Sequence, residues 1–305
     1  MKTLSRPLLL GLAVIAVVSW GGSWPAGKIL APMAPPEVLT FWRFFIVSIS
    51  FIPLITLSKK SFLIPRKTLW YLLTAGLALA LYFKLFFLGL REGLAGMGSV
   101  IVNGFNPLFL FFGALLFFKK PIHGKSMIGL LIGIAGGLIL FKAWHFEGSE
   151  LFAPGNLYFL TDAAVLAVAT VLGSKAQKYM PSLTFNFYAY SMVAVLMFFI
   201  ALFQGGAVAD WSKIIAPLEY GYLFWGGILY MSLIATTFGL GIYFFTVKRL
   251  GARQAGAFTF LAPVSAVVLS WIVVAETPQI STIIGGSMAI AGVYLINKDA
   301  DKEDI

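Results

Sequence analysis

The chain contains about ten apolar runs, each close to the length that a helix needs to cross a lipid bilayer. A spanning helix requires roughly 20 mostly apolar residues. Hydrophobic residues make up 60% of this chain and charged residues only 11%. The runs lie near residues 7–27, 36–57, 67–89, 94–118, 124–141, 155–174, 182–204, 219–247, 254–274 and 279–297. They are far longer than the roughly ten alternating residues of an outer-membrane β-strand. We therefore predict an all-α polytopic membrane protein with about ten transmembrane helices.

The two halves of the chain repeat one another at a constant spacing. Three landmarks recur 156 residues later, as the pairs Pro107 and Pro263, Gly129 and Gly285, and Gly136 and Gly292. Each half holds five apolar runs, and five crossings reverse the direction of the chain. We therefore predict two inverted five-helix repeats, residues 7–142 and 154–297. Inverted repeats around a site at the bilayer midplane are typical of secondary transporters.

Lysine and arginine concentrate at alternate ends of the predicted helices. One set of ends carries sixteen basic residues, namely Lys2, Arg6, Lys59, Lys60, Arg66, Lys67, Lys119, Lys120, Lys125, Lys175, Lys178, Lys248, Arg249, Arg253, Lys298 and Lys302. The other ends carry four, which are Lys28, Arg91, Lys142 and Lys213. The positive-inside rule then predicts a multi-pass protein of the cytoplasmic (inner) membrane with both termini in the cytoplasm. The net charge of +10 is thus a topology signal. Nucleic acid is not an expected partner, because no extramembrane segment is long enough to form a basic surface.

Several residue types that carry catalysis are missing. The chain has no cysteine, which excludes disulfides and thiolate chemistry. Its two histidines, His123 and His145, fall in predicted loops. No phosphate-binding Gly-rich loop and no His-Glu-x-x-His motif occur, and Asp162 is the one acid clearly inside a span. We therefore expect no catalytic residues, no resident metal and no cofactor.

A set of short motifs accompanies the repeat. These are Trp20-Gly21 followed by Lys28 and mirrored by Lys175, Leu250-Gly251-Ala252 leading to Ala262-Pro263, Ala275-Glu276, and Gly285 followed by Ala291-Gly292-Val293. Together with the ten spans they resemble the drug/metabolite transporter (DMT) superfamily, and within it EamA-type transporters with two EamA repeats. The resemblance covers nearly all of residues 8–297. The family's acidic residue at the end of the fourth span is present as Glu276, but Lys120 replaces it in the first repeat, which favours a topology or interface role.

The resemblance implies a fold and a function. Spans one to four of each repeat would enclose a central cavity, and the fifth spans would pack at the periphery. The small-residue stripe of residues 129–137 suits such packing, either inside the chain or, as the less favoured alternative, across a homodimer. The implied function is secondary transport by alternating access, with export of amino acids or related metabolites. The alternatives are an uncoupled channel or facilitator, and an importer of a phosphorylated or sugar-type metabolite. Expected partners are a small-molecule substrate, the lipid bilayer, and a proton or counter-substrate.

Three ionisable side chains inside spans are candidates for the cavity, because charge within a membrane is costly. Asp162 lies about eight residues into its span, roughly 12 Å deep. It suits proton coupling, contact with a substrate amine, or a structural ion pair. Arg43 could clamp a substrate carboxylate or pair with Asp162 or Glu37. Lys84 lies closer to the outer end, so it either lines the cavity or extends its stem to the interface.

The remaining candidates are aromatic, polar or helix-bending residues. The cavity candidates are Trp20, Trp24, Tyr82, Asn103, Asn106, Tyr243 and Thr259, and each has helix packing as its alternative role. The hinge candidates are Gly21, Pro25, Pro107 and Pro263, because proline removes a helical hydrogen bond and bends its helix. The residues around Gly21 and Pro25 are expected to break or bend the first helix beside the cavity.

Overall fold

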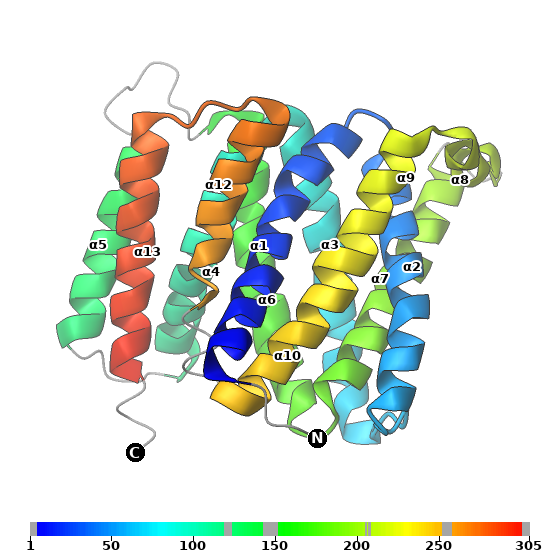
Figure 1. The fold of residues 1–305 in the computed structure, drawn as a ribbon, viewed down its shortest axis with the longest axis horizontal. Helices are drawn as coiled ribbons and strands as arrows, with labels where there is room; N and C mark the ends of the chain where they lie inside the picture. The colour runs from blue at the N-terminus through cyan, green and yellow to red at the C-terminus, as the bar shows by residue number, and fades with distance from the viewer. Residues whose placement is uncertain are drawn as a thin grey trace.

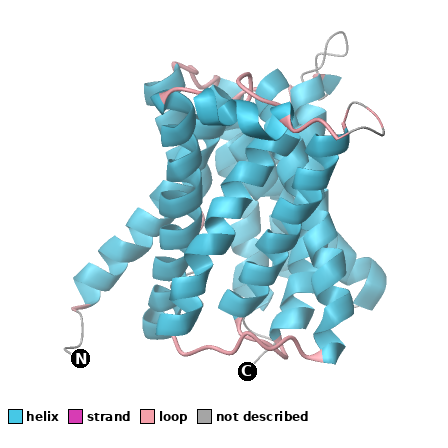
Figure 2. Cartoon of the chain, turned by 90° about the vertical axis from the view of Figure 1, so that its right-hand side faces the viewer, coloured by secondary structure: helices cyan, strands magenta, loops and turns pink. Residues whose placement is uncertain are grey.

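The computed structural model describes residues 5–118, 124–142, 152–204, 206, 209–251 and 258–300. In these ranges the chain consists of helices and connecting loops, without strands (Figure 2). The long helices stand side by side, and the loops gather at two opposite ends (Figure 1). The predictions made for Lys120, His123 and His145 fall outside the described residues.

Within the described ranges, each half of the chain contributes five spans. The first half forms α1 (Arg6–Leu30), α2 (Pro36–Leu57), the 3₁₀ turn η1 (Arg66–Thr68) with α3 (Leu69–Glu92), α4 (Ala95–Phe118) and α5 (Gly124–Leu140). The second half forms α6 (Pro154–Gln177), α7 (Ser182–Phe203), a span composed of α9 (Tyr222–Leu229), η4 (Tyr230–Phe238) and α10 (Gly239–Leu250), then α12 (Leu261–Val274) and α13 (Ile280–Ala300). The short elements α8 (Ser212–Ile215) and η3 (Ala216–Glu219) join α7 to α9.

The lengths and composition of these helices confirm the predicted class. Six of the spans are individually long and apolar enough to cross a membrane, and four shorter apolar helices accompany them within the described residues. Proline marks several starts: Pro7, Pro36 and Pro154 occupy the first or second position of α1, α2 and α6. A missing N–H costs nothing there, because the first N–H groups of a helix have no partner inside it. At the end of α10, Gly251 takes a φ of 86°, which a residue without a Cβ accepts readily.

The packing of the helices follows the internal repeat. Helices that the repeat relates to one another pack as direct pairs, α2 with α7, α4 with α12 and α5 with α13. Two further groups of contacts also match one another under the repeat. In the first group α3 and α4 pack against α6. In the second group the span from α9 to α10, together with α12, packs against α1. Lys28, near the end of α1, and Gly155, at the start of α6, both lie against Gly93. The helices α1 and α6 therefore run in opposite directions, as an inverted repeat requires.

The contact between α5 and α13 is made by glycines. A Cβ added to Gly285 would lie 2.5 Å from the carbonyl oxygen of Gly136, and one added to Gly292 would lie 2.5 Å from that of Gly129. The backbones are thus in direct contact, as in other small-residue helix pairs in membranes. Gly137, which the spacing placed on the same stripe, lies against Phe105 instead. The small-residue stripe therefore packs inside the chain.

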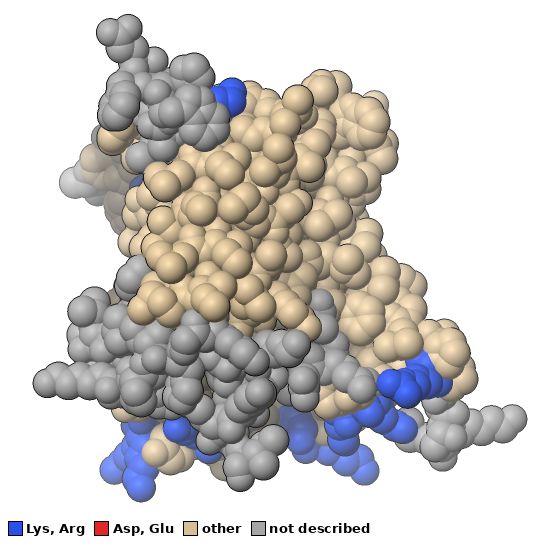
Figure 3. Space-filling model, turned by 90° about the vertical axis from the view of Figure 1, so that its left-hand side faces the viewer, with Lys and Arg blue, Asp and Glu red and all other residues tan. Residues whose placement is uncertain are grey.

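The two ends of the molecule differ in the charged side chains that they carry. The described basic side chains at the end where α1 begins are Arg6, Lys59, Lys60, Arg66, Lys67, Lys175, Lys178, Lys248 and Arg249. Figure 3 shows lysine and arginine gathered at this lower end, below a broad uncharged face. We call it the basic end, and the opposite end, with Glu37, Glu92, Asp210, Glu219 and Glu276, the acidic end.

At the acidic end, charged side chains bind free backbone groups of neighbouring helices. Lys28 Nζ donates to two carbonyl oxygens at the end of α3, at 2.8 and 2.6 Å. Arg91 donates to two carbonyl oxygens just after α1, at 2.9 Å each through Nη2. Glu276 accepts hydrogen bonds from the N–H groups of Ala95 and Gly96, at 2.9 and 3.0 Å. Because the first N–H groups of α4 lack helical partners, Glu276 caps α4 of the other repeat.

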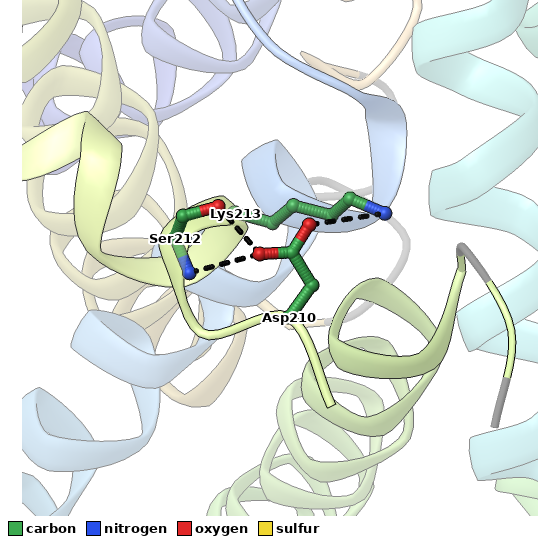
Figure 4. Close-up of polar contacts among 3 residues, drawn as sticks. All are labelled: Asp210, Ser212 and Lys213. Atoms are coloured by element: carbon green, nitrogen blue, oxygen red, sulfur yellow. Dashed lines mark hydrogen bonds and ion pairs between the residues drawn. The ribbon is translucent and has the colours of Figure 1, made fainter. Parts of the chain in front are cut away.

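A small polar cluster organises the loop before α8. Asp210 accepts hydrogen bonds from the backbone N–H and the hydroxyl of Ser212, and its second oxygen lies 3.7 Å from Lys213 Nζ (Figure 4). The donated hydroxyl of Ser212 holds the pKa of the Asp210 carboxyl below its ordinary value of 3.8. The cluster starts the turn into α8.

Candidate substrate cavity

A cavity of ≈ 190 Å³ lies between the two repeats. Its polar and charged lining residues are Ser23, Arg43, Tyr82, Asn103, Tyr190 and Thr236. Its apolar lining residues are Trp20, Trp24, Phe83, Phe86, Ala235, Leu240 and Ala262. They come from α1 to α4 and from α7, η4, α10 and α12, so both halves build the wall. The volume equals that of roughly six water molecules at about 30 Å³ each, which suits a small organic molecule.

Arg43 is the single charged side chain among the described lining residues. Its guanidinium lies 5.1 Å from the ring centres of Phe44 and Phe83 and 5.8 Å from that of Phe86, so cation–π attraction holds it in place. Nη2 donates to Thr236 Oγ1 at 3.3 Å, while Nε has no hydrogen-bond partner among the described residues. Arginine has five N–H donors in a planar fork. The guanidinium therefore keeps donors for a planar acceptor such as a carboxylate.

Thr236 belongs to an irregular segment of its span. The segment η4 is π-helical over nine residues, and π-helical turns are rare and frequent at functional sites. The hydroxyls of Thr236 and Thr237 donate to carbonyl oxygens five residues earlier, at 2.8 and 3.0 Å. Thr236 also receives the Arg43 hydrogen bond, and Thr237 Oγ1 lies 2.6 Å from Ser50 Oγ of α2. Two successive hydroxyls thus tie η4 to α2.

Aromatic rings form most of the remaining wall. Trp24 packs edge-on against Phe86 at 4.9 Å and Phe159 at 5.7 Å between ring centres. Trp20 lies 5.0 Å from Tyr243, which is absent from the described lining residues. Tyr243 therefore supports the position of Trp20 from outside the cavity.

Asp162 lies outside the cavity lining. Its side chain is fully buried in α6, and neither carboxyl oxygen has a hydrogen-bond partner among the described residues. The ion pair with Arg43 that the sequence allowed does not occur. The helix α6 that holds Asp162 packs against α3 and α4, which contribute Tyr82 and Asn103 to the cavity wall. A buried carboxylate without hydrogen-bond partners is costly in its ionised form. Asp162 therefore stays a candidate functional residue, although it lies outside the cavity lining.

Lys84 forms an ion pair with Glu37. The distance from Lys84 Nζ to Glu37 Oε1 is 2.7 Å, and the two side chains are 35% and 2% exposed. Glu37 thus takes Lys84 as its partner rather than Arg43. Lys84 is also absent from the described lining residues. The pair joins α3 to the first turn of α2.

The amides and the threonine of the predicted site have separate positions. Asn103 lines the cavity, and its amide nitrogen donates to the carbonyl and hydroxyl oxygens of Ser99 at 2.8 and 3.2 Å. Asn106 donates to the carbonyl oxygen of Ala163 at 3.2 Å, which joins α4 to α6. Thr259 is half-buried just before α12 and does not belong to the described lining.

The hinge candidates lie in helices that stay continuous. The helix α1 continues through Gly21 and Pro25, so of the predicted break or bend there is no break. The missing side chain at Gly21 instead admits Ser265 of α12, whose hydroxyl would collide with a Cβ there. Pro107 lies inside the continuous α4, whereas Pro263 lies in the first turn of α12, where proline disturbs little. The two prolines thus occupy unequal positions despite the repeat.

Three polar wall residues, Tyr190, Thr236 and Ser23, were not among the sequence candidates. The repeat contains a signal for the first, since Tyr190 is the counterpart of Arg43 at a spacing of 147 residues. No sequence signal marks Thr236, because its position depends on the π-helical turn. Among the described residues no group of three His, Asp or Glu side chains could hold a metal ion.

Inverted helical repeats around a polar, aromatic-walled cavity define this chain as a multi-pass α-helical membrane transport protein. The model of the EamA-like transporter family matches residues 8–142 and 153–298. The chain therefore belongs to the EamA-like transporter family, within the DMT superfamily.

Curated relatives and a solved structure agree with this assignment. An uncharacterized transporter of Archaeoglobus fulgidus is 24% identical over 93% of this chain and 95% of its own length. The uncharacterized transporter YetK of Bacillus subtilis is 26% identical over 93% of this chain and 84% of its own. A probable amino-acid metabolite efflux pump of Salmonella typhimurium is 23% identical over 93% of both chains. A crystal structure with 17% identity shares the fold, with a TM-score of 0.63 over 99% of this chain and 100% of the other.

Proposed function

We propose that this protein is a secondary transporter that exports small amino acids or related carboxylates by alternating access. The observation that carries the proposal is Arg43, a buried cation that lines a small aromatic cavity and has an N–H, at Nε, without a partner among the described residues. Its fork fits a carboxylate, and the faces of the surrounding rings attract an ammonium group. The efflux pump of Salmonella typhimurium supports export of amino-acid metabolites. The basic end faces the cytoplasm of the cell membrane in this proposal.

Asp162 is the proposed coupling group. It is fully buried without a hydrogen-bond partner among the described residues, on a helix that packs against α3 and α4 of the cavity wall. A proton taken up by Asp162 would remove one buried charge from the helix that packs against two of the cavity's walls. Substrate binding and protonation would then depend on each other.

Transport by purified protein in proteoliposomes tests the role of Arg43. Wild type is expected to take up a labelled small amino acid when a pH gradient is imposed, and Arg43→Gln to lose at least 100-fold in rate. The double variant Arg43→Tyr with Tyr190→Arg moves the cation to the repeat-related position. It is expected to recover at least a tenth of the wild-type rate. Arg66→Gln, at the basic end, is the matched control. Full transport by Arg43→Gln would refute the proposed carboxylate site.

A second experiment separates coupling from mere facilitation. Asp162→Asn is expected to keep exchange of labelled for unlabelled substrate while uptake no longer responds to the pH gradient. Equal responses of wild type and Asp162→Asn to the gradient would exclude Asp162 as the coupling group. A wild type that ignores every imposed gradient would identify a facilitator instead. Helical content and thermal unfolding of each variant distinguish lost transport from lost folding.

A further inference from the structure

A second, larger cavity opens at the basic end of the molecule. This cleft has a volume of ≈ 1100 Å³ and lies between the end of α2, the start of α7, and η4 with α10. Figure 1 shows the lower ends of α10 and α7 at this edge. Its walls are mostly apolar and include Leu57, Leu233 and Phe238, which are 82%, 37% and 50% exposed. In a membrane-spanning protein, apolar side chains exposed at this depth face lipid chains.

The rim of the cleft carries three cations. Lys60, Lys248 and Arg249 line it, and none of the three has an ion-pair partner among the described residues. The loop that holds Lys60 is fixed over α7, because the hydroxyls of Thr184 and Tyr188 donate to its carbonyl oxygens at 2.7 and 2.8 Å. Three of the nine described basic side chains of the basic end are thus gathered at the mouth of this cleft. Such basic pockets between helices attract anionic headgroups.

The cleft is long enough for the acyl chain of one leaflet of a bilayer. On this span its wall runs from Leu233, near the middle of Tyr222–Leu250, to Lys248 at the rim. Fifteen residues separate the two, which is a rise of roughly 22 Å at 1.5 Å per residue. Half of the ≈ 30 Å hydrocarbon core is about 15 Å. At the deep end the Thr237 hydroxyl is already hydrogen-bonded to Ser50. The interior therefore offers an acyl chain an apolar wall with few unsatisfied polar groups.

We propose that this cleft binds an anionic phospholipid of the leaflet at the basic end, with its phosphate on Lys60, Lys248 and Arg249 and an acyl chain along α10. This proposal is independent of the transported substrate. Each cation near an anionic headgroup contributes roughly a fivefold gain in affinity. Removing all three is therefore expected to lower affinity for an anionic lipid by roughly 100-fold.

Native mass spectrometry and thermal unfolding of the purified full chain in detergent test the proposal. The probes are phosphatidylglycerol, phosphatidylcholine with the same acyl chains, and soluble glycerol phosphate. Wild type is expected to retain and be stabilised by phosphatidylglycerol alone. The variant Lys60→Gln/Lys248→Gln/Arg249→Gln is expected to lose this effect. The control Arg66→Gln/Lys67→Gln/Lys178→Gln removes the same charge from the same end outside the cleft, and is expected to keep it.

Gly241→Leu provides a test that leaves every charge in place. Gly241 lines the cleft, and a Cβ there would meet no atom within 4 Å, so a leucine would fill the space meant for the acyl chain. This variant is expected to lose phosphatidylglycerol binding while remaining folded. Equal losses in both triple variants would show diffuse charge attraction and overturn the proposal. Equal binding of phosphatidylcholine, or equal stabilisation by glycerol phosphate, would overturn it as well.

Discussion

Variants of the ion pair between Lys84 and Glu37 test whether Lys84 stabilises the fold or takes part in transport. Lys84→Met would leave the Glu37 carboxylate, 2% exposed, without its cation. Removing one partner of a fully buried pair costs about 3–5 kcal/mol. Because Lys84 is itself 35% exposed, water weakens the pair, and we expect a loss of about 2–3 kcal/mol.

The reverse change should cost less. In Glu37→Gln the Lys84 ammonium can reach the interface through its flexible stem. The variant loses the pair and the favourable charge in the first turn of α2, together about 1 kcal/mol. The double variant leaves no unpaired charge, so it should also lose only about 1 kcal/mol. The two single losses are thus expected to exceed the double loss by more than 1 kcal/mol.

Reversible unfolding in mixed micelles, followed by helical circular dichroism, measures these energies. Transport by the same proteins, scaled to folded protein, should stay within about twofold of wild type, since Lys84 does not line the described cavity. Additive losses would show that the pair has no energetic role. Lost transport in a fully stable double variant would return Lys84 to the substrate path and refute the structural assignment.

Three further outcomes follow from local geometry. Gly285→Ala forces a Cβ against the α5 backbone, and we expect it to lower the free energy of unfolding by about 1–2 kcal/mol after the gain in helix propensity is counted. Gly226→Ala is the control, because a Cβ there would meet nothing within 4 Å, and it should lose no stability in the same unfolding assay. Thr237→Val should cost about 1 kcal/mol by removing the hydrogen bond to α2, and Thr237→Ser should restore it. The Asp210 cluster should be complete above pH 3.8 and be lost as pH falls through the lowered pKa of the folded state; Ser212→Ala should return that pKa towards 3.8 in a carboxyl titration followed by NMR.

The sequence was sufficient for the spans, and for a physical reason. A membrane helix must make all its backbone hydrogen bonds within itself and present apolar side chains to lipid. Each span is therefore recognisable in the sequence as one continuous apolar run. The prediction of a span over 36–57, for example, agrees with α2 at Pro36–Leu57. The partners of a side chain, in contrast, are often distant in the sequence. Nothing in the neighbourhood of Lys84 shows that Glu37, on another helix, will lie 2.7 Å away.

The π-helical segment η4 shows a second limit. Hydropathy does not distinguish an α-helical from a π-helical turn, since both satisfy the backbone internally. The difference arises from hydroxyls that bond five residues back and to α2. The bonds of these hydroxyls to Arg43 and Ser50 exist only once η4 and α2 pack together. The position of Thr236 in the cavity wall is therefore a product of tertiary structure.

The repeat also explains how one cation comes to lie in the cavity. Because α2 and α7 pack as a repeat-related pair, positions 43 and 190 both reach the cavity wall. Two arginines there would repel each other in a site with little water, and two tyrosines would leave it without charge. The unequal pair gives a single guanidinium surrounded by aromatic rings. The repeated backbone provides the paired helices on which alternating access depends in inverted-repeat transporters. Unequal side chains at matched positions, such as Arg43 and Tyr190, provide the groups that can distinguish one substrate from another.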